Sequence, residues 1–517
     1  MSSTIEKSVN EENLLQNLAL VAFLSGLAAL INEVVWGYRF SSQLGSSLLA
    51  HSCVLGVFMV FLALGALAGG KFSTFQPVRR LMLVQLALAF AGPLATALTG
   101  TLPRYLTIVG MSSSTLFRLG NDVLVVTLCL AIPCTLMGMT LPLLFACLKK
   151  TVVQESAPQI YGVNTIGGAL GALLSGFVLL RAVGVIHSSL LAGVFNLLAA
   201  SLVYSSLSLT TTLTDNDRAE EVESSFVAES ACYIAAFVSG AYVLSLELMW
   251  LRLTNYVLGE RAAAASLLIG IVLLALGFSA WVTPRFVKGR ESSLLLGYLL
   301  TASAIVGTLS GILGWWFLVP WTEKLTGPLS RCFYTALLLL PTFLIVGLVT
   351  PASICLLRGL REQAGQVTGL LFFGNALAAM VGSLFTGYCL VPAVGSPKAF
   401  LLSALFPLAA AIYLLPKEKR AVLGLVVLVG FLIPNPPVYN PVEDGGEILA
   451  HREDAFGVNT IVKSTSGPVL LYSNRSLLVN PIGLRSTTLA QHLQGHLPML
   501  LASESKSALN IGTGYGI

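Results

Sequence analysis

The hydrophobic and polar positions divide the chain into a long apolar part and a shorter tail of alternating pattern. Before residue 416, apolar residues form twelve stretches, each close to the about 20 residues that a helix needs to cross a bilayer. The stretches cover residues 15–35, 48–70, 81–102, 123–146, 160–180, 188–204, 232–249, 263–282, 294–319, 334–357, 367–390 and 399–415. The pattern predicts an all-α polytopic membrane domain with about twelve transmembrane helices.

The two sets of six stretches repeat one another. Matching residues recur 214 positions later in the first stretch and 211 positions later in the fifth. An even number of helices in each unit brings both copies into the membrane from the same side, so we expect two parallel six-helix repeats, like the halves of major-facilitator transporters. The matches are Ser25-Gly26, Glu33, Trp36 and Gly45 with Ser239-Gly240, Glu247, Trp250 and Gly259; Ala63-Leu64-Gly65 with Ala275-Leu276-Gly277; Gly138 and Pro142 with Gly347 and Pro351; and Asn164, Gly171, Gly176 and Gly184 with Asn375, Gly382, Gly387 and Gly395.

Four polar residues inside the membrane stretches are candidates for a functional site. Glu33 and Glu247 occupy matching places before a Trp, and a carboxylate in hydrocarbon usually faces a bundle interior or a water-filled cavity. They are expected either to form a symmetric pair that binds a cation or relays protons, or to lie at the interface and pair locally. The local partners would be Tyr38 or Arg39 in the first copy and Arg252 in the second. Asn164 and Asn375 precede glycines, which predicts close helix packing with an interhelical hydrogen bond, and a substrate role is the alternative.

Prolines mark the fourth helix of each repeat. They predict a kink or a break there, as in a packing kink or a discontinuous transport helix. The prolines are Pro133, Pro142, Pro341 and Pro351.

After Pro441 the pattern changes to period two. Segments 456–462, 468–472 and 476–479 are predicted as short strands of a small antiparallel sheet, followed by a helix over 486–501 and a strand over 508–511. The last residues form a G-x-G-x-G turn, which ordinarily opens a helix that cradles a nucleotide or S-adenosyl ligand. The candidate ligand-binding residues are Asn510, Gly512, Thr513, Gly514 and Gly516.

Charge supports this organisation. Hydrophobic residues make up 55% of the chain and charged residues only 10%, against about 25% in ordinary soluble proteins. The net charge of +5 arises mainly in loops, so nucleic-acid binding is not expected. The eight cysteines form no C-x-x-C motif, and His492 and His496 have no third ligand nearby, so no disulfide framework and no metal site are predicted.

The Lys and Arg distribution predicts a cytoplasmic N-terminus. With that orientation, the tail and inner loops carry 15 basic residues and the outer loops 9. The apolar run over 421–433 has thirteen residues and is either a thirteenth helix or an interfacial segment. The interfacial alternative is favoured because it keeps the tail in the cytosol, where S-adenosyl nucleotides are made.

The tail resembles spermidine synthases and the wider polyamine aminopropyltransferase family. The residues that carry the resemblance are Arg452-Glu453-Asp454-Ala455-Phe456-Gly457, His496-Leu497-Pro498 and Ile511-Gly512-Thr513-Gly514. With the Ser-Gly…Glu-x-x-Trp opening of both repeats, the whole chain resembles the bacterial family of fused major-facilitator/spermidine-synthase proteins. The resemblance implies a bacterial inner (plasma) membrane location, a Rossmann-like methyltransferase-type domain, decarboxylated S-adenosylmethionine or S-adenosylmethionine as cofactor, and a small cationic amine as substrate.

The chain also departs from the family pattern. The positions of the family's Gln, Asp-Glu pair and Tyr hold Pro481, Ser486-Thr487 and Ala490, and no catalytic residue is predicted within the chain. We therefore expect a spermidine-synthase-like membrane protein, catalytically incomplete as given and a fragment of a longer protein. The alternatives are a transporter or membrane scaffold with a central polar cavity and a vestigial or regulatory Rossmann segment, and a methyltransferase-like donor site with another acceptor.

These predictions give one order of parts along the chain. They are a cytoplasmic tail over 1–14, a first membrane repeat over 15–205, an acidic linker over 206–231, a second membrane repeat over 232–415, a basic loop with a short apolar segment over 416–441, a small β-domain over 442–482, and the truncated start of a Rossmann domain over 483–517.

Overall fold

The computed structural model describes residues 2–44, 48–110, 115–148, 152–211, 226–258, 261–287, 292–321, 325, 327–357, 360–420, 446–453, 458–465, 469–473 and 476–479. Within these ranges, 12 helices are long and apolar enough to cross a membrane. The predicted number of spans is therefore confirmed for the described part of the chain.

The first six spans form one half of the membrane domain. Its helices are α1 (Ser2–Leu44), α2 (Leu48–Phe72), α3 (Pro77–Gly110), α4 (Thr115–Ala146), α5 (Val153–Leu174) and α7 (Gly184–Thr211), with the π-helical turn η1 (Ser175–Leu179) and α6 (Leu180–Ala182) continuing α5.

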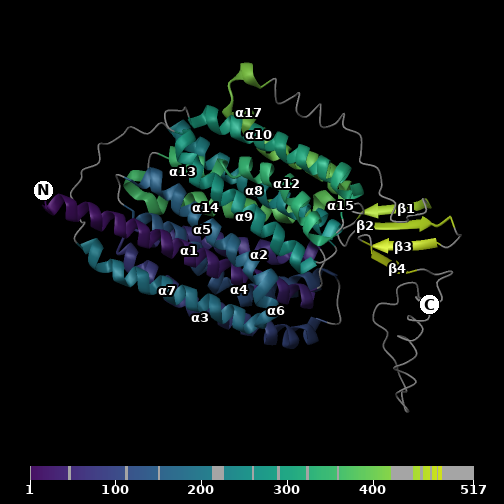
Figure 1. Ribbon diagram of the computed structural model, residues 1–517, viewed down its shortest axis with the longest axis horizontal. Coiled ribbons are helices and arrows are strands. Elements are labelled where there is room, and N and C mark those ends of the chain that lie inside the picture. The colour runs from purple at the N-terminus through teal and green to yellow at the C-terminus, as the bar shows by residue number, and fades with distance from the viewer. Residues whose placement is uncertain are drawn as a thin grey trace, which may run out of the picture.

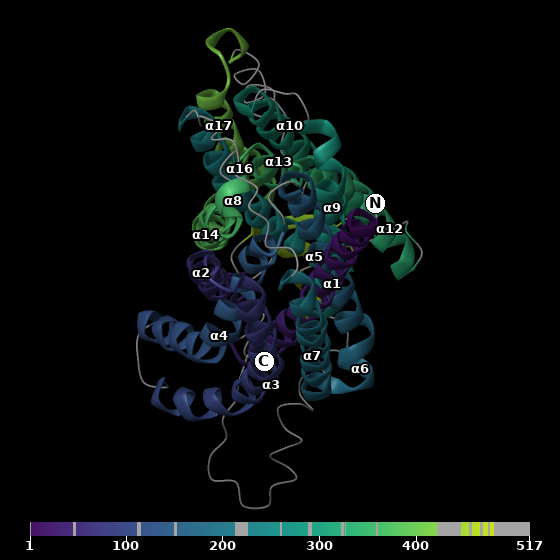
Figure 2. The ribbon, with the colours of Figure 1, turned by 90° about the vertical axis from the view of Figure 1, so that its left-hand side faces the viewer.

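The second six spans form the other half, and Figure 2 shows the two halves lying one above the other. Its helices are α8 (Phe226–Leu258), α9 (Arg261–Val287), α10 (Ser292–Leu313) with η2 (Gly314–Leu318) and α11 (Val319–Trp321), α12 (Pro328–Val346) with α13 (Val349–Leu356), α14 (Leu360–Phe385) with η3 (Thr386–Leu390) and α15 (Val391–Val394), and α16 (Ser396–Ser403) with α17 (Leu405–Leu414). A short 3-10 turn, η4 (Lys417–Lys419), follows.

Each half is held together by glycines that let two helices touch. A Cβ added at Gly26 of α1 would lie 2.0 Å from the carbonyl oxygen of Asn164 in α5. The matching Gly240 of α8 would place its Cβ 2.1 Å from the carbonyl oxygen of Asn375 in α14. Because small residues allow such backbone approach in membranes, the duplicated glycines bring the first and fifth helices of each half into direct contact.

The register of the duplication differs from the predicted one in the second helix. Gly56 of α2 faces Leu384, and Gly270 of α9 faces Leu173, which gives the same 214-residue offset as in the first helix. The predicted match of residues 63–65 with residues 275–277 is therefore wrong by two positions. Runs of Ala, Leu and Gly are too alike for a match by composition to fix the register.

The fourth helices of the two halves bend differently. Helix α4 continues through Pro133 and Pro142. In the second half the chain ends α12 at Val346, turns through Gly347, and begins α13, which contains Pro351. The predicted break is present in one copy, whereas the other copy accommodates its prolines within a single helix.

A four-stranded antiparallel sheet follows the membrane helices. Its strands pair in the order β1 (Glu447–Glu453), β2 (Val458–Lys463), β3 (Val469–Ser473) and β4 (Ser476–Val479). The sheet lies at the end of the helix bundle away from the N-terminus (Figure 1). Strand β1 was not predicted, because most of its side chains are exposed and show no alternation of apolar and polar residues.

Several predicted features lie outside the described residues. They are the apolar run over 421–433, the helix over 486–501, the strand over 508–511 and the glycine turn that follows it. The Rossmann-like fold of the tail stays a prediction for this reason. The small β-domain is present, with one strand more than expected.

Replacing Gly26 by Leu should weaken the membrane domain, because the carbonyl of Asn164 occupies the space that the side chain needs. We expect the unfolding free energy to fall by about 1–3 kcal/mol, as overpacking usually costs. Chemical unfolding in detergent measures this effect. Gly37→Leu on the same helix is the control, because a Cβ at Gly37 meets nothing within 4 Å. Equal losses in the two variants would contradict the packing account.

Candidate functional site

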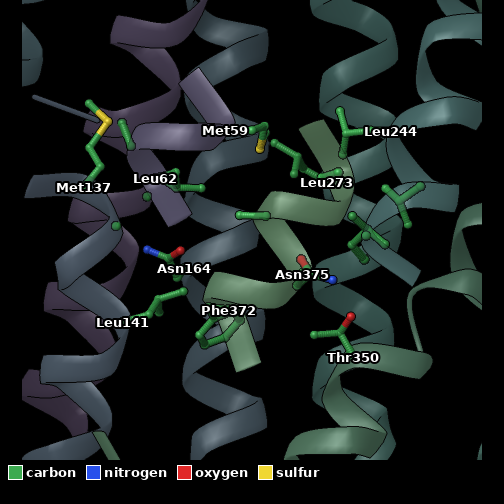
Figure 3. A pocket seen from close by; sticks show the side chains of 18 of the residues that line it. Met59, Leu62, Met137, Leu141, Asn164, Leu244, Leu273, Thr350, Phe372 and Asn375 are labelled. Carbon is green, nitrogen blue, oxygen red and sulfur yellow. The ribbon is translucent and has the colours of Figure 1, made fainter. Parts of the chain in front are cut away.

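A cavity of about 280 Å³ lies between the two halves of the membrane domain. Its walls come from α1, α2, α4 and α5 in the first half and from α8, α9, α12, α13 and α14 in the second. Figure 3 shows side chains from both halves around it, including Asn164 and Asn375. Most of the surface is apolar, and the polar groups are few and come from both repeats.

The lining is itself duplicated. All of its residues except Ala66, Thr140, Ala376 and Ala379 fall into pairs at the offsets found along the sequence. The pairs are Ser25/Ser239, Gly26/Gly240, Ala29/Val243, Leu30/Leu244, Glu33/Glu247, Leu55/Ile269, Phe58/Val272, Met59/Leu273, Leu62/Leu276, Met137/Val346, Gly138/Gly347, Leu141/Thr350, Tyr161/Phe372 and Asn164/Asn375. The cavity thus lies at the repeat interface, where transporters built from repeats hold their substrates.

Glu33 and Glu247 both line this cavity. For Glu247, the predicted local pairing with Arg252 is not met, because Arg252 forms an ion pair with Glu453 instead. The cavity lining contains no Lys, Arg or His. The two carboxylates are therefore the ionisable acidic groups that a molecule inside the cavity meets, and no basic group of the lining neutralises them.

Asn164 and Asn375 have a structural role that the sequence predicted. The side-chain amide of Asn164 donates a hydrogen bond to the carbonyl oxygen of Ala22 at 2.8 Å, and that of Asn375 donates to Ala236 at 2.6 Å. These bonds tie α5 to α1 and α14 to α8, so the predicted interhelical hydrogen bond is confirmed in both halves. The same two residues line the cavity, and a direct contact with substrate stays a prediction.

The halves touch mainly along two helix pairs, α2 with α14 and α5 with α9. On the side nearer the sheet, Gly56 faces Leu384 and Gly270 faces Leu173. Toward the N-terminal side, a Cβ at Gly369 would lie 2.8 Å from the Cα of Gly70. The cavity therefore lies between two levels of contact between the halves.

Three π-helical turns in the described helices were not predicted from the sequence, and two of them belong to the duplication. The turns η1 and η3 continue the fifth helix of each half at matching positions. Their glycines, Gly176 and Gly387, face Ser266 and Ser52 across the contact between the halves. Such turns often mark functional sites in membrane and soluble helices, and here the duplicated glycines were their only sequence signal.

The predicted nucleotide-binding residues cannot be placed. Asn510, Gly512, Thr513, Gly514 and Gly516 lie outside the described part of the chain, as do His492 and His496. Among the residues that the structure describes, no group of three His, Cys, Asp or Glu side chains could hold a metal ion.

Comparison with known proteins gives one match in sequence and several in structure. No protein-family model matches the chain. A stretch of 181 residues is 28% identical to polyamine aminopropyltransferase 2 of Streptomyces coelicolor, over 32% of this chain and 30% of that protein. The chain thus spans less than a third of the length of this curated relative.

Solved transporter structures resemble the membrane part over nearly their full lengths. The human organic anion transporter MFSD10 matches with a TM-score of 0.54 and 14% identity, over 78% of this chain and 99% of that one. The membrane part has a major-facilitator-like fold. A bacterial homologue of the iron transporter ferroportin in an outward-facing state matches this fold with a TM-score of 0.53 and 13% identity, over 79% and 99% of the chains. The proton:xylose symporter XylE matches with a TM-score of 0.52 and 13% identity, over 79% and 96%.

These transporters are named for an organic anion, iron and xylose. At such low sequence identity, the likeness shows the major-facilitator-like fold and not the cargo. What this chain binds has to be inferred from the residues of its own cavity.

Replacing Asn164 by Ala should remove one interhelical hydrogen bond. We expect the unfolding free energy to fall by about 0.6 kcal/mol and by no more than about 1.7 kcal/mol, the range measured for such bonds in membranes. Asn375→Ala should have a similar effect, and the two losses should add because the bonds lie in different halves. Chemical unfolding in detergent checks this, and a loss in one half only would contradict the equivalence of the two bonds.

Proposed function

We propose that the membrane part of this chain is a transporter that carries a small organic cation through the central cavity. The observation that carries the proposal is the pair Glu33 and Glu247, which the duplication relates and which faces a cavity without basic residues. Carboxylates in a membrane interior are energetically costly, and those that occur there usually mark a substrate, ion or proton pathway. A cation between them provides the missing opposite charge.

The remaining lining supports an organic cation over a bare metal ion. Leucine, methionine and aromatic side chains cover most of the wall, which suits an apolar body attached to a charged nitrogen. Metal ions such as Ca²⁺ require several oxygen ligands at once. A volume of about 280 Å³ lies just below the range of about 300–1,000 Å³ of drug-sized pockets, so the cargo is small. A small amine has this chemistry.

Transport would proceed by rocking of the two halves around the cavity. Opening the α2/α14 and α5/α9 contacts on one side while keeping those on the other exposes the carboxylates to one compartment at a time. We place the protein in a bacterial inner (plasma) membrane with a cytoplasmic N-terminus, on the basis of the family resemblance and the Lys and Arg distribution.

A second candidate function is group transfer by the tail. The 28% match to a polyamine aminopropyltransferase favours it, together with the glycine turn at residues 512–516. In this hypothesis, Asn510, Gly512, Thr513, Gly514 and Gly516 contribute to a site for decarboxylated S-adenosylmethionine or S-adenosylmethionine. A measurement of S-adenosyl-nucleotide binding to the full chain tests this hypothesis. Absence of binding would exclude group transfer by the tail and leave transport as the remaining proposal.

Neutralising the cavity carboxylates should abolish cation transport. We expect Glu33→Gln and Glu247→Gln each to lower the uptake of a radiolabelled organic amine into proteoliposomes by at least tenfold, since each removes a carboxylate that attracts the cationic cargo. A panel of mono- and diamines, with an organic anion as comparison, identifies the cargo. Asp122→Asn is the matched control, because Asp122 lies on α4 but not on the cavity wall. Cation uptake that survives both Glu replacements would rule out the proposal.

Linking the two halves covalently should stop transport as well. A Cβ at Gly56 lies 3.4 Å from the Cγ of Leu384, which is close enough for a disulfide between Gly56→Cys and Leu384→Cys. We expect the oxidised double variant to lose amine uptake and the reduced one to regain it. Each single Cys variant is the control. Full uptake with the disulfide formed would show that these contacts do not open.

A further inference from the structure

A carboxylate of the sheet inserts into the second half of the membrane domain. Glu453, the last residue of β1, places Oε1 2.9 Å from Nε of Arg252 in α8. Its Oε2 accepts a hydrogen bond from the backbone N–H of Ser396 at 2.9 Å, and the Ser396 hydroxyl donates to Oε1. Ser396 is the first residue of α16, so the carboxylate also meets the positive end of that helix.

Both charged partners are largely removed from solvent. The side chains of Arg252 and Glu453 are 6% and 11% exposed. A buried charge that loses its partner is strongly destabilising, so the two residues hold each other in place. Val458 of β2, which is 2% exposed, adds an apolar contact within the core cluster that contains Trp250 and Phe400.

A glycine is required beside this carboxylate for two reasons. Gly395 has a φ of +77°, which favours glycine. A Cβ there would also lie 2.9 Å from Oε2 of Glu453. The space for the carboxylate therefore depends on the absence of a side chain.

The first half of the duplication has positions that match Arg252, Gly395 and Ser396, and no part of the described sheet binds there. The positions of Arg252 and Ser396 correspond there to Tyr38 and Val185, so neither the positive charge nor the serine hydroxyl that binds Glu453 is present. Tyr38 is 48% exposed. Gly184 has nearly the same φ as Gly395, +75°, but a Cβ there meets nothing within 4 Å. The arginine and the serine thus occur at these positions only in the half that receives the sheet.

We propose that Arg252, Gly395 and Ser396 form a docking socket for Glu453, which fixes the sheet β1–β4 to the second half on the side of the membrane opposite the N-terminus. The side follows from the chain order, because α8 enters the membrane on the same side as α1 and Arg252 lies near its far end. Figure 1 shows the N-terminus and the sheet at opposite ends of the bundle.

This placement conflicts with one sequence expectation. The N-terminus and the tail cannot both be cytoplasmic if β1 lies on the side of the membrane opposite the N-terminus. Opposite sides are what the thirteenth-helix alternative for residues 421–433 requires. All three residues of the socket belong to the second half, so we expect the sheet to move together with that half. The inference does not depend on the cargo of the cavity.

Accessibility of Val458→Cys to a maleimide tests the socket in the full chain with exposed native cysteines replaced. We expect Gly395→Ala to speed the labelling of Val458→Cys at least tenfold and Gly184→Ala to leave it unchanged. Both replacements put an alanine at a positive φ, but only the one at residue 395 places a Cβ against Glu453. Arg252→Tyr, which copies the first half, should act like Gly395→Ala. Native Cys134, fully buried, is kept as a reference that must stay unreactive in a folded variant. Equal labelling in all variants overturns the socket.

The side of the membrane is tested with a membrane-impermeant maleimide on intact cells. Leu449→Cys, at a site that is 49% exposed on β1, and Asn13→Cys, at an exposed site on α1, report the two ends. We expect one of the two sites to be labelled in intact cells and the other only after permeabilisation. Labelling of both sites under the same condition overturns the proposed opposite placement.

Discussion

The contact between the first and fifth helix of each half determines the geometry of the cavity. Gly26 against the carbonyl of Asn164, and Gly240 against that of Asn375, allow these helices to approach until their backbones touch. The hydrogen bonds from the two Asn side chains then fix the contact. Because Glu33 and Glu247 lie two turns beyond these glycines on α1 and α8, the same contact directs both carboxylates into the space between the halves.

Much of this arrangement could be predicted from the sequence. Hydropathy gave the twelve spans, and the duplication of Gly26, Glu33 and Asn164 indicated which residues would share an environment. The duplication could not show which way each side chain faces, so local pairing with Arg252 was left open as an alternative for Glu247. That choice depends on Glu453, a residue distant in sequence that binds Arg252 instead.

Other features depend on tertiary contacts that leave little local signal. The π-helical turns η1 and η3 occur in apolar sequence, and only the repeated Gly176 and Gly387 hinted at them. The side chains of strand β1 are mostly exposed, so apolar and polar residues do not alternate along it. Only its hydrogen-bonded pairing with β2 identifies it as a strand. The helix register was misjudged in α9 because composition alone does not distinguish neighbouring positions in an apolar run.

The central claim is that the cavity binds an organic cation between Glu33 and Glu247. An experimental structure of the protein with a transported amine bound tests this claim most directly. The account predicts density for the cargo inside the cavity, with a cationic nitrogen within about 4 Å of a carboxylate oxygen of Glu33 or Glu247. Carboxylates turned toward the lipid headgroups, or cargo bound away from both of them, would contradict it.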